Sequence, residues 1–195
     1  GVKIYGGCTR LYAQKSLAFY FRDSYGFKKL NYRLFPELPI TEYNNFILRS
    51  SGQDWWRTMF RDAFVQTIIR KNMDVDNQAY RPSVLFINGD YWGIHNIREK
   101  LNEHYIEEHY QIKEDNIDLI EYSKGITANV GDRIAYDAMM NYFQNNSLAD
   151  SSKYEYIKSI LDINSFIDYY ICQIYGANAD WPGSNTKLWH AKDNT

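Results

Sequence analysis

The sequence predicts an α+β fold, in which a mostly antiparallel sheet is followed along the chain by a helical part. Three observations lead to this prediction. Residues 15–22 alternate between apolar and polar side chains, which is typical of a half-buried strand. Two strand-like runs flank Asn88-Gly89, the pair that type I′ hairpin turns favour. From Asp132 onward the apolar residues recur at helical spacing.

The first half of the chain contains three predicted strands before any helix. They cover residues 2–6, 15–22 and 44–52, and a loop rich in small residues joins the first two. Asp54 is expected to cap a helix that runs to about Lys71. Its apolar residues fall close to one helical face: Trp56, Met59, Phe60, Phe64 and Ile68.

The second half begins with the hairpin around Asn88-Gly89, which covers residues 81–100. A helix is expected from near Glu99 to Tyr110, and a short strand over 117–123. Three helices then follow over 132–144, 153–161 and 163–177, with Asp132 and Asn164 as expected caps, before a returning strand over 186–190.

Composition limits the classes of function that the chain can have. With 195 residues, 45% of them hydrophobic, the chain can form one domain, or most of a larger one, with a sizeable core. A net charge of −2 excludes a bulk basic surface that binds nucleic acid by charge alone. No run of 18 apolar residues is present, so no membrane span is expected. No signal peptide is visible, and the immediate strand-like start is consistent with the removal of upstream sequence.

Several familiar chemistries lack their motifs. No GxxxxGK[ST] or GxSxG pattern is present, which argues against a Walker-type nucleotide site and a serine hydrolase. The four histidines form no metal triad, and Cys8 and Cys172 are too few for a disulfide scaffold or a zinc pattern. Aromatic residues make up 17%, so they fill the core or form a surface that stacks sugars or other ligands.

Asp180 and Asn185 stand five positions apart around the pair Pro182-Gly183. The catalytic loop of protein kinases has this spacing: its Asp accepts the proton of the acceptor hydroxyl, and its Asn binds a magnesium ion. Asp and Asn flanking a Pro-Gly pair are also ordinary turn residues. Spacing alone therefore leaves a catalytic loop and a simple turn both open.

A kinase also needs a strand lysine that reaches the nucleotide phosphates and a helix glutamate that holds it. Lys15 begins the predicted strand 15–22, and Glu99 stands at the junction of the hairpin and the next helix. Arg10, in the small-residue loop, is a second candidate for a phosphate contact. The alternative is that Lys15 is a solvated edge lysine and Glu99 belongs to a first-turn charge pattern.

Four segments, which together span nearly the whole chain, resemble the CotH kinase family, first known from a spore-coat protein. The most specific is "YRPSVLFINGDYWGIHNIREK". "GGCTRLYAQKSLAFYFRDSYG", "LRSSGQDWWRTMFRDAF" and "ADWPGSNTKLW" support it. The family residues matched in the hairpin are Tyr80, Arg81, Pro82, Asn88, Gly89, Asp90, Tyr91, Trp92, Gly93, Arg98, Glu99 and Lys100.

The resemblance implies an atypical, secretory-type protein kinase that transfers phosphate from ATP to Ser or Thr with Mg²⁺ or Mn²⁺. It implies that Lys15 holds the phosphates, that Glu99 anchors Lys15, that Asp180 is the acid/base and that Asn185 is a metal ligand. It also implies a kinase-like domain over 1–195, N-lobe-like to about 122 and helical from about 123. Its expected partners are protein substrates, and its expected location is a bacterial spore coat, the cell envelope or the exterior.

The chain departs from the family pattern at one point. A kinase needs a second metal-binding aspartate, expected beyond the Asp180–Asn185 segment, and Asp193 is the only later acid. A chain truncated at its C-terminus explains this, as does a non-catalytic member that serves as a coat or cell-surface assembly module. A carbohydrate-binding protein that uses its aromatics is the third hypothesis.

Overall fold

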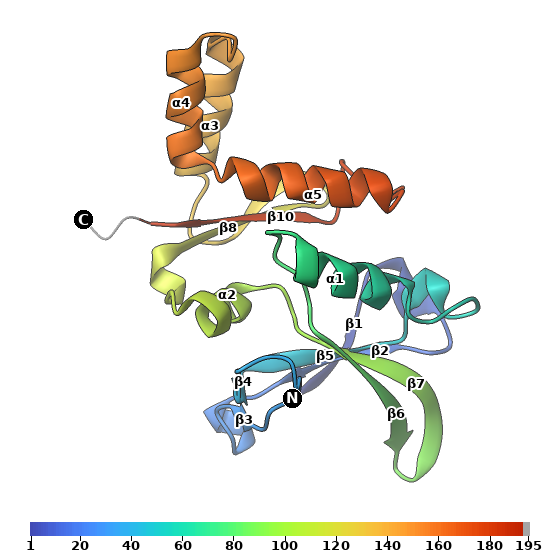
Figure 1. Cartoon of the computed structure of the whole chain (residues 1–195). Coiled ribbons are helices and arrows are strands. Elements are labelled where there is room, and N and C mark those ends of the chain that lie inside the picture. The colour runs from blue at the N-terminus through green and yellow to red at the C-terminus, as the bar shows by residue number, and fades with distance from the viewer. Residues whose placement is uncertain (193–195) are drawn as a thin grey trace. The chain divides into compact units, whose positions relative to one another are not determined.

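The computed structural model describes residues 1–192. They form two compact units, the first made of residues 1–71 and 76–111 and the second of residues 72–75 and those from 112 on (Figure 1). The predicted boundary near residue 122 differs from this one, so the strand over Ile117–Tyr122 belongs to the second unit.

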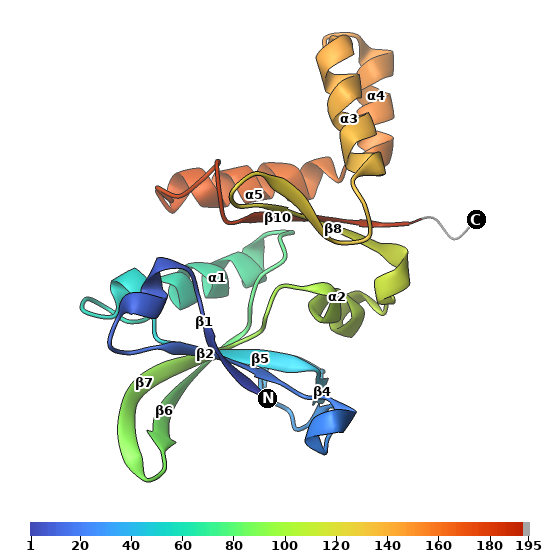
Figure 2. The same ribbon diagram turned by 180° about the vertical axis from the view of Figure 1, so that it is seen from behind.

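The first unit is built on a five-stranded antiparallel sheet, shown from behind in Figure 2. Its spatial order is β1 (Val2–Tyr5), β2 (Ser16–Tyr20), β5 (Asn45–Arg49), β7 (Asp90–Arg98) and β6 (Tyr80–Ile87). The helix α1 (Arg61–Asn72) connects β5 to β6 along the chain, and α2 (Glu103–Tyr110) follows β7. A small sheet of β3 (Leu30–Asn31) and β4 (Glu42–Tyr43) lies in the insertion between β2 and β5; the sequence did not predict it.

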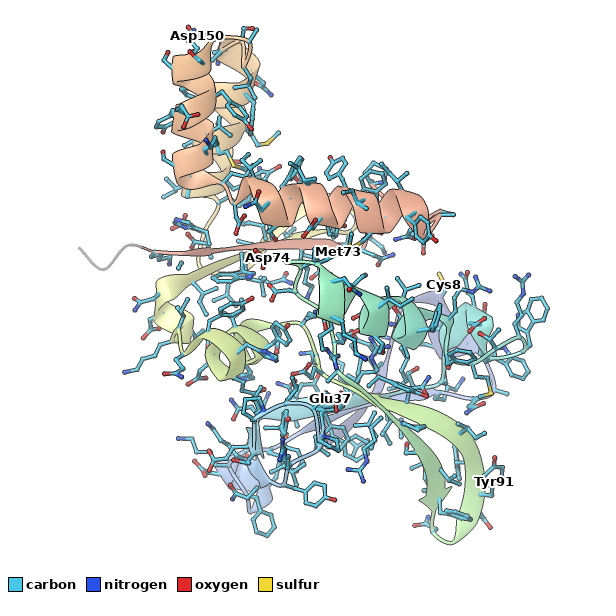
Figure 3. All side chains as sticks on the ribbon, in the orientation of Figure 1. Cys8, Glu37, Met73, Asp74, Tyr91 and Asp150 are labelled. Carbon is cyan, nitrogen blue, oxygen red and sulfur yellow. The ribbon has the colours of Figure 1, made fainter. Side chains whose placement is uncertain are left out.

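The predicted hairpin is confirmed. Asn88 and Gly89 both have positive φ, at 55° and 90°, which the right-handed twist of a two-residue hairpin requires. The part of the hairpin nearest the turn is solvent-exposed, and Figure 3 shows Tyr91 beside the turn, where its side chain is 62% exposed.

The apolar core of the first unit lies where the insertion meets the sheet. Phe35 packs edge-on against Tyr43, with ring centroids 5.8 Å apart, and Leu34 and Ala79 complete the buried cluster. Burial raises the pKa of the Tyr43 hydroxyl above its ordinary range. This phenol therefore stays neutral, and the cluster stays uncharged at physiological pH.

The helix predicted from Asp54 begins seven residues later, at Arg61. Asp54 ends a short 3₁₀ turn, and its carboxylate accepts hydrogen bonds from the Thr58 hydroxyl, at 2.5 Å, and the Arg61 amide, at 3.1 Å. Met59, at φ 62°, interrupts helical geometry between them. The predicted apolar face is largely in solvent: Phe60, Phe64 and Ile68 are 48–55% exposed.

The helix after the hairpin begins at Glu103 rather than near Glu99. The Asn102 side chain caps it by accepting a hydrogen bond from the Tyr105 amide at 3.4 Å. Glu99 therefore lies just past the end of β7 and outside the helix.

The second unit contains a three-stranded antiparallel sheet in the order β10 (Thr186–Ala191), β8 (Ile117–Tyr122) and β9 (Ile126–Val130). The helices α3 (Ile134–Asn145), α4 (Ser151–Ile160) and α5 (Ile163–Tyr175) come between β9 and β10 along the chain. The buried Asp118, on β8, links the segment before α3 to the residue after β10. Its carboxylate accepts a hydrogen bond from the Asp132 amide at 2.9 Å and forms an ion pair with Lys192 at 3.1 Å.

Three details of this unit differ from the sequence predictions. The strand β9 was not predicted, and Asp162 rather than Asn164 caps α5, because its side chain accepts from the Ser165 amide at 3.0 Å. The N-cap of α3 is Arg133 rather than the expected Asp132, which stands one residue earlier, although the Asp132 carboxylate accepts a hydrogen bond from the Ile134 amide at 2.8 Å. Among the helices of residues 1–192, none combines the length and apolar character needed to cross a membrane.

Candidate active site

The loop between β1 and β2 carries two of the predicted phosphate-binding cations, Arg10 and Lys15. It turns at Gly6, where φ is 112°, and then forms a 3₁₀ turn over Cys8–Leu11. Lys15 Nζ donates a hydrogen bond to the Arg10 carbonyl oxygen at 2.6 Å, which brings both residues together inside the loop.

Two contacts with β7, which lies beyond β5 in the sheet, fix the end of this loop. His95, on β7, lies with Nε2 3.0 Å from the Lys15 carbonyl oxygen. Gln14 Nε2 donates to the Ile94 carbonyl oxygen at 2.7 Å. The two contacts hold the chain where Lys15 enters β2.

Glu99 is buried, at 3% exposure, and has partners other than Lys15. One carboxylate oxygen accepts a hydrogen bond from the Ala79 amide at 2.7 Å, and the other lies 2.6 Å from His109 Nε2. The predicted Lys15–Glu99 ion pair is not present among the ion pairs of residues 1–192. The physical reason is that other groups hold the Glu99 carboxylate. They are the Ala79 amide, just before β6, and the His109 side chain on α2.

A different charged cluster joins the sheet to α1, and the sequence analysis did not identify it. Asp62, in the first turn of α1, pairs with Arg98 Nη1 at 2.7 Å and with Arg49 Nη1 at 3.5 Å. Arg98 is 1% exposed and also donates through Nε to the Ala79 carbonyl oxygen at 3.1 Å. Arg49 closes β5 and is 38% exposed.

The register of the strands explains why this cluster forms. Ile47 pairs with Arg98, and Arg49 pairs with Asn96, so the two arginines stand on one face of the sheet. Asp62 reaches both. Burial alone would raise the pKa of its carboxyl, but Arg49 and Arg98 outweigh burial and hold that pKa below the usual value. The available sequence signal was Asp62 in "RDAF", since an acid is favourable in the first turn of a helix, but its arginine partners could not be read from the pattern.

In the second unit, Asp180 and Asn185 lie in the loop between α5 and β10, and both side chains are exposed. The Asp180 amide donates to Asn178 Oδ1 at 3.1 Å, and the Ser184 hydroxyl donates to the Asp180 carbonyl oxygen at 3.2 Å. Asn185 takes φ 59° and then leads into β10. These contacts shape the loop, and the Asp180 and Asn185 side chains remain exposed.

The donor set of this loop suits a hard divalent cation only in part. Residues 1–192 contain no group of three or more His, Cys, Asp and Glu side chains that could hold a metal ion. Mg²⁺ is usually bound by one or two carboxylates together with substrate phosphates, so the Asp180 and Asn185 oxygens fit a site that phosphates complete. Asp193, the remaining candidate acid, lies outside the described residues.

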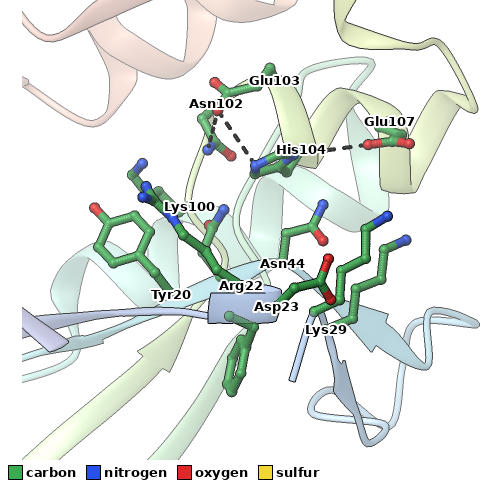
Figure 4. Close-up of a pocket in the computed structure, with 13 residues that line it drawn as sticks. Tyr20, Arg22, Asp23, Lys29, Asn44, Lys100, Asn102, Glu103, His104 and Glu107 are labelled. Atoms are coloured by element: carbon green, nitrogen blue, oxygen red, sulfur yellow. Dashed lines mark hydrogen bonds and ion pairs between the residues drawn. The ribbon is translucent and has the colours of Figure 1, made fainter. Parts of the chain in front are cut away.

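The first unit contains a pocket of about 560 Å³ (Figure 4). It opens at the ends of β2 and β7 opposite the β1–β2 loop, and it contains none of Arg10, Lys15 and Glu99. Lys100 lines it with Nζ 5.1 Å from the centre of the Tyr20 ring. His104 sits between Glu103 and Glu107, 3.7 and 3.9 Å from their carboxylates.

Comparison with known proteins identifies the family. The family model described as CotH kinase protein matches residues 2–195, which is nearly the whole chain. The comparison with curated proteins finds no match. The matched range includes the β1–β2 loop, the hairpin, Glu99 and the Asp180–Asn185 loop. The chain therefore belongs to the CotH kinase family.

Proposed function

We propose that this protein is an ATP-dependent Ser/Thr protein kinase of the CotH type that works with Mg²⁺ or Mn²⁺. The observation that carries the proposal is the family match over residues 2–195, within which the candidate residues occur in the order that kinase chemistry uses. Along the chain, the first unit supplies the cations Arg10 and Lys15. The second unit then supplies the acid Asp180 and the amide Asn185.

The proposed roles follow from the chemistry of each side chain. Arg10 and Lys15, which stand in the glycine-containing β1–β2 loop, would neutralise the negative charge of the nucleotide's phosphate oxygens. The Asp180 carboxylate would accept the proton of a Ser or Thr hydroxyl, which its exposure allows. Asn185 would offer its side-chain oxygen to the cation, which when bound screens the charge of the transferring phosphoryl group. Glu99 would hold the end of β7 through Ala79 and His109.

Phosphate transfer from labelled ATP tests this proposal. The purified protein is incubated with Mg²⁺ or Mn²⁺ and a mixture of Ser/Thr-containing proteins, beside its Asp180→Asn and Asp150→Asn variants. Asp150 is an exposed helix cap on α4, which makes it a matched control. Asp180→Asn should lower labelling by at least about 10²-fold because it removes the proton acceptor, and Asp150→Asn should leave labelling unchanged.

The alternative function is a non-catalytic CotH-like module that assembles in a coat or at a cell surface. The many exposed aromatic residues, such as Phe86 and Tyr91 on the hairpin, favour a role in assembly. Thermal unfolding with ATP and metal separates the two functions, because a nucleotide at about 100 times its Kd adds about 2.7 kcal/mol of stability. The kinase function predicts this shift, and the module predicts none. We propose a spore-coat, envelope or secreted location for either function.

A further inference from the structure

The cluster of Arg49, Asp62 and Arg98 has the arrangement that kinase chemistry requires of its phosphate-binding cation. In protein kinases a cation on the third strand of the sheet contacts the nucleotide phosphates, and an acid on the following helix holds that cation. Here β5 is the third strand of the five-stranded sheet in chain order, and α1 is the helix that follows it. Arg49 lies on β5 and Asp62 on α1, with Nη1 and Oδ2 3.5 Å apart.

The two arginines around Asp62 have different environments. Arg98 is buried and makes the shorter contact, at 2.7 Å, so it fixes the position of the carboxylate. Arg49 makes the looser contact and its side chain is 38% exposed. One arginine therefore holds the acid in place, and the other keeps a guanidinium at the surface.

Arg49 also lies at the end of the sheet where the β1–β2 loop is. The Ser16 and Ser50 hydroxyls are 3.0 Å apart, which places the residue after Lys15 beside the residue after Arg49. Gly52, three residues after Arg49, also lies close to this loop, because a Cβ added to it would stand 3.3 Å from Cγ2 of Thr9, a residue of the 3₁₀ turn. The end of β5 is thus a neighbour of the loop that carries Arg10 and Lys15.

We propose that Arg49 is the strand cation that contacts the nucleotide phosphates, and that Asp62, held by Arg98, is its positioning residue. This inference rests on the proposed kinase function, and it transfers to Asp62 the anchoring role that the sequence assigned to Glu99. A guanidinium suits the task, because its planar donors bind two phosphate oxygens at once.

The test measures the Kd for Mg-ATP and for adenosine with four forms of the protein: unchanged, Arg49→Met, Arg49→Lys and Arg61→Met. Arg61 is the first residue of α1, the helix that carries Asp62. Its side chain is 57% exposed and forms an ion pair with Asp54, so Arg61→Met controls for the loss of a nearby charge. Arg49→Met should weaken Mg-ATP binding at least about tenfold, as the loss of a charged hydrogen bond does. Arg49→Lys should recover only part of the affinity, because it restores the charge without the planar pair of donors, and Arg61→Met should change the affinity less than about twofold.

Adenosine distinguishes a phosphate contact from a structural effect, because it lacks phosphates. Its affinity should be the same for the unchanged protein and Arg49→Met. Equal Mg-ATP affinity of those two forms overturns the assignment of Arg49 and leaves the kinase function standing, and a parallel loss of adenosine and Mg-ATP binding overturns it as well. If the unchanged protein binds no Mg-ATP, the kinase function and this inference both fail.

Discussion

The Arg98 guanidinium lies 2.7 Å from the Asp62 carboxylate and thereby connects the end of β7 to the start of α1. Arg98 is among the largest side chains of the first unit that are fully buried. A buried charge requires hydrogen-bonding partners, and here Asp62, the Ala79 carbonyl oxygen and Gln78 provide them. This contact positions the helix on the sheet.

Replacement of Arg98 by methionine should destabilise the protein by about 2–4 kcal/mol. Breaking a buried ion pair typically costs about 3–5 kcal/mol, and the partly exposed Asp62 reduces that figure. The free energy of unfolding is measured in urea. Lys158→Met, which breaks the exposed pair with Glu155, is the control and should cost less than about 1 kcal/mol. Equal losses for both variants would show that the Arg98 contact is not a structural anchor.

Glu108 should make the protein less stable as the pH rises from about 4.5 to about 7. Burial, assisted by the nearby Glu99, raises the pKa of its carboxyl to about 7, while the Asn44 amide opposes the shift. Because the folded state holds this proton more tightly than the unfolded state, folding is favoured at low pH and loses that contribution on ionisation.

The variant Glu108→Gln isolates this effect, because its amide oxygen can still accept from the Asn44 amide. Urea unfolding at pH 5, 6, 7 and 8 should show a gain of about 1–3 kcal/mol at pH 8 relative to the unchanged protein, and a smaller difference at pH 5. A difference between the two proteins that is constant from pH 5 to pH 8 would rule out the raised pKa.

Gly131 should not tolerate a side chain. It has φ 66°, and a Cβ at this position would overlap Asp118 Oδ1 and lie 2.5 Å from the Ile117 carbonyl oxygen. Gly131→Ala should therefore cost about 2–5 kcal/mol, the sum of left-handed strain and overpacking. Gly183→Ala, in the same unit but with open space around it, should change stability by less than about 0.5 kcal/mol. Thermal unfolding of both variants compares them, and similar midpoints would refute the steric explanation.

Local chemistry made much of the fold predictable. Asn88-Gly89 defines its hairpin because both residues accept positive φ, and period-two alternation locates β2. Helix starts were predicted less well. Asp54 offered a plausible start for α1, but the positive φ of Met59 delays the helix. Asp162 caps α5 in place of Asn164, and Asn102 caps α2 beyond Glu99. A linear pattern does not show which of two nearby residues becomes the cap.

The candidate site residues could be proposed from the sequence and stay predictions, whereas the ion pairs around them could not be foreseen. Residue types and order pointed to Lys15, Glu99, Asp180 and Asn185, whereas ion pairing depends on register. Arg49 and Arg98 face Asp62 because β5 and β7 pair as they do, and the sequence pattern does not reveal that register. The partners of Glu99 likewise depend on where α2 begins.

Phosphoryl transfer to protein tests the kinase function most directly. Protein-bound phosphoserine and phosphothreonine are measured after incubation with labelled ATP and Mg²⁺ or Mn²⁺, for the unchanged protein and Asp180→Asn at equal concentration. We predict label on Ser or Thr with the unchanged protein and at least about 10²-fold less with the variant, because Asp180 is the proposed proton acceptor. Equal labelling by both proteins, or none by the unchanged protein with either metal, would contradict the proposal.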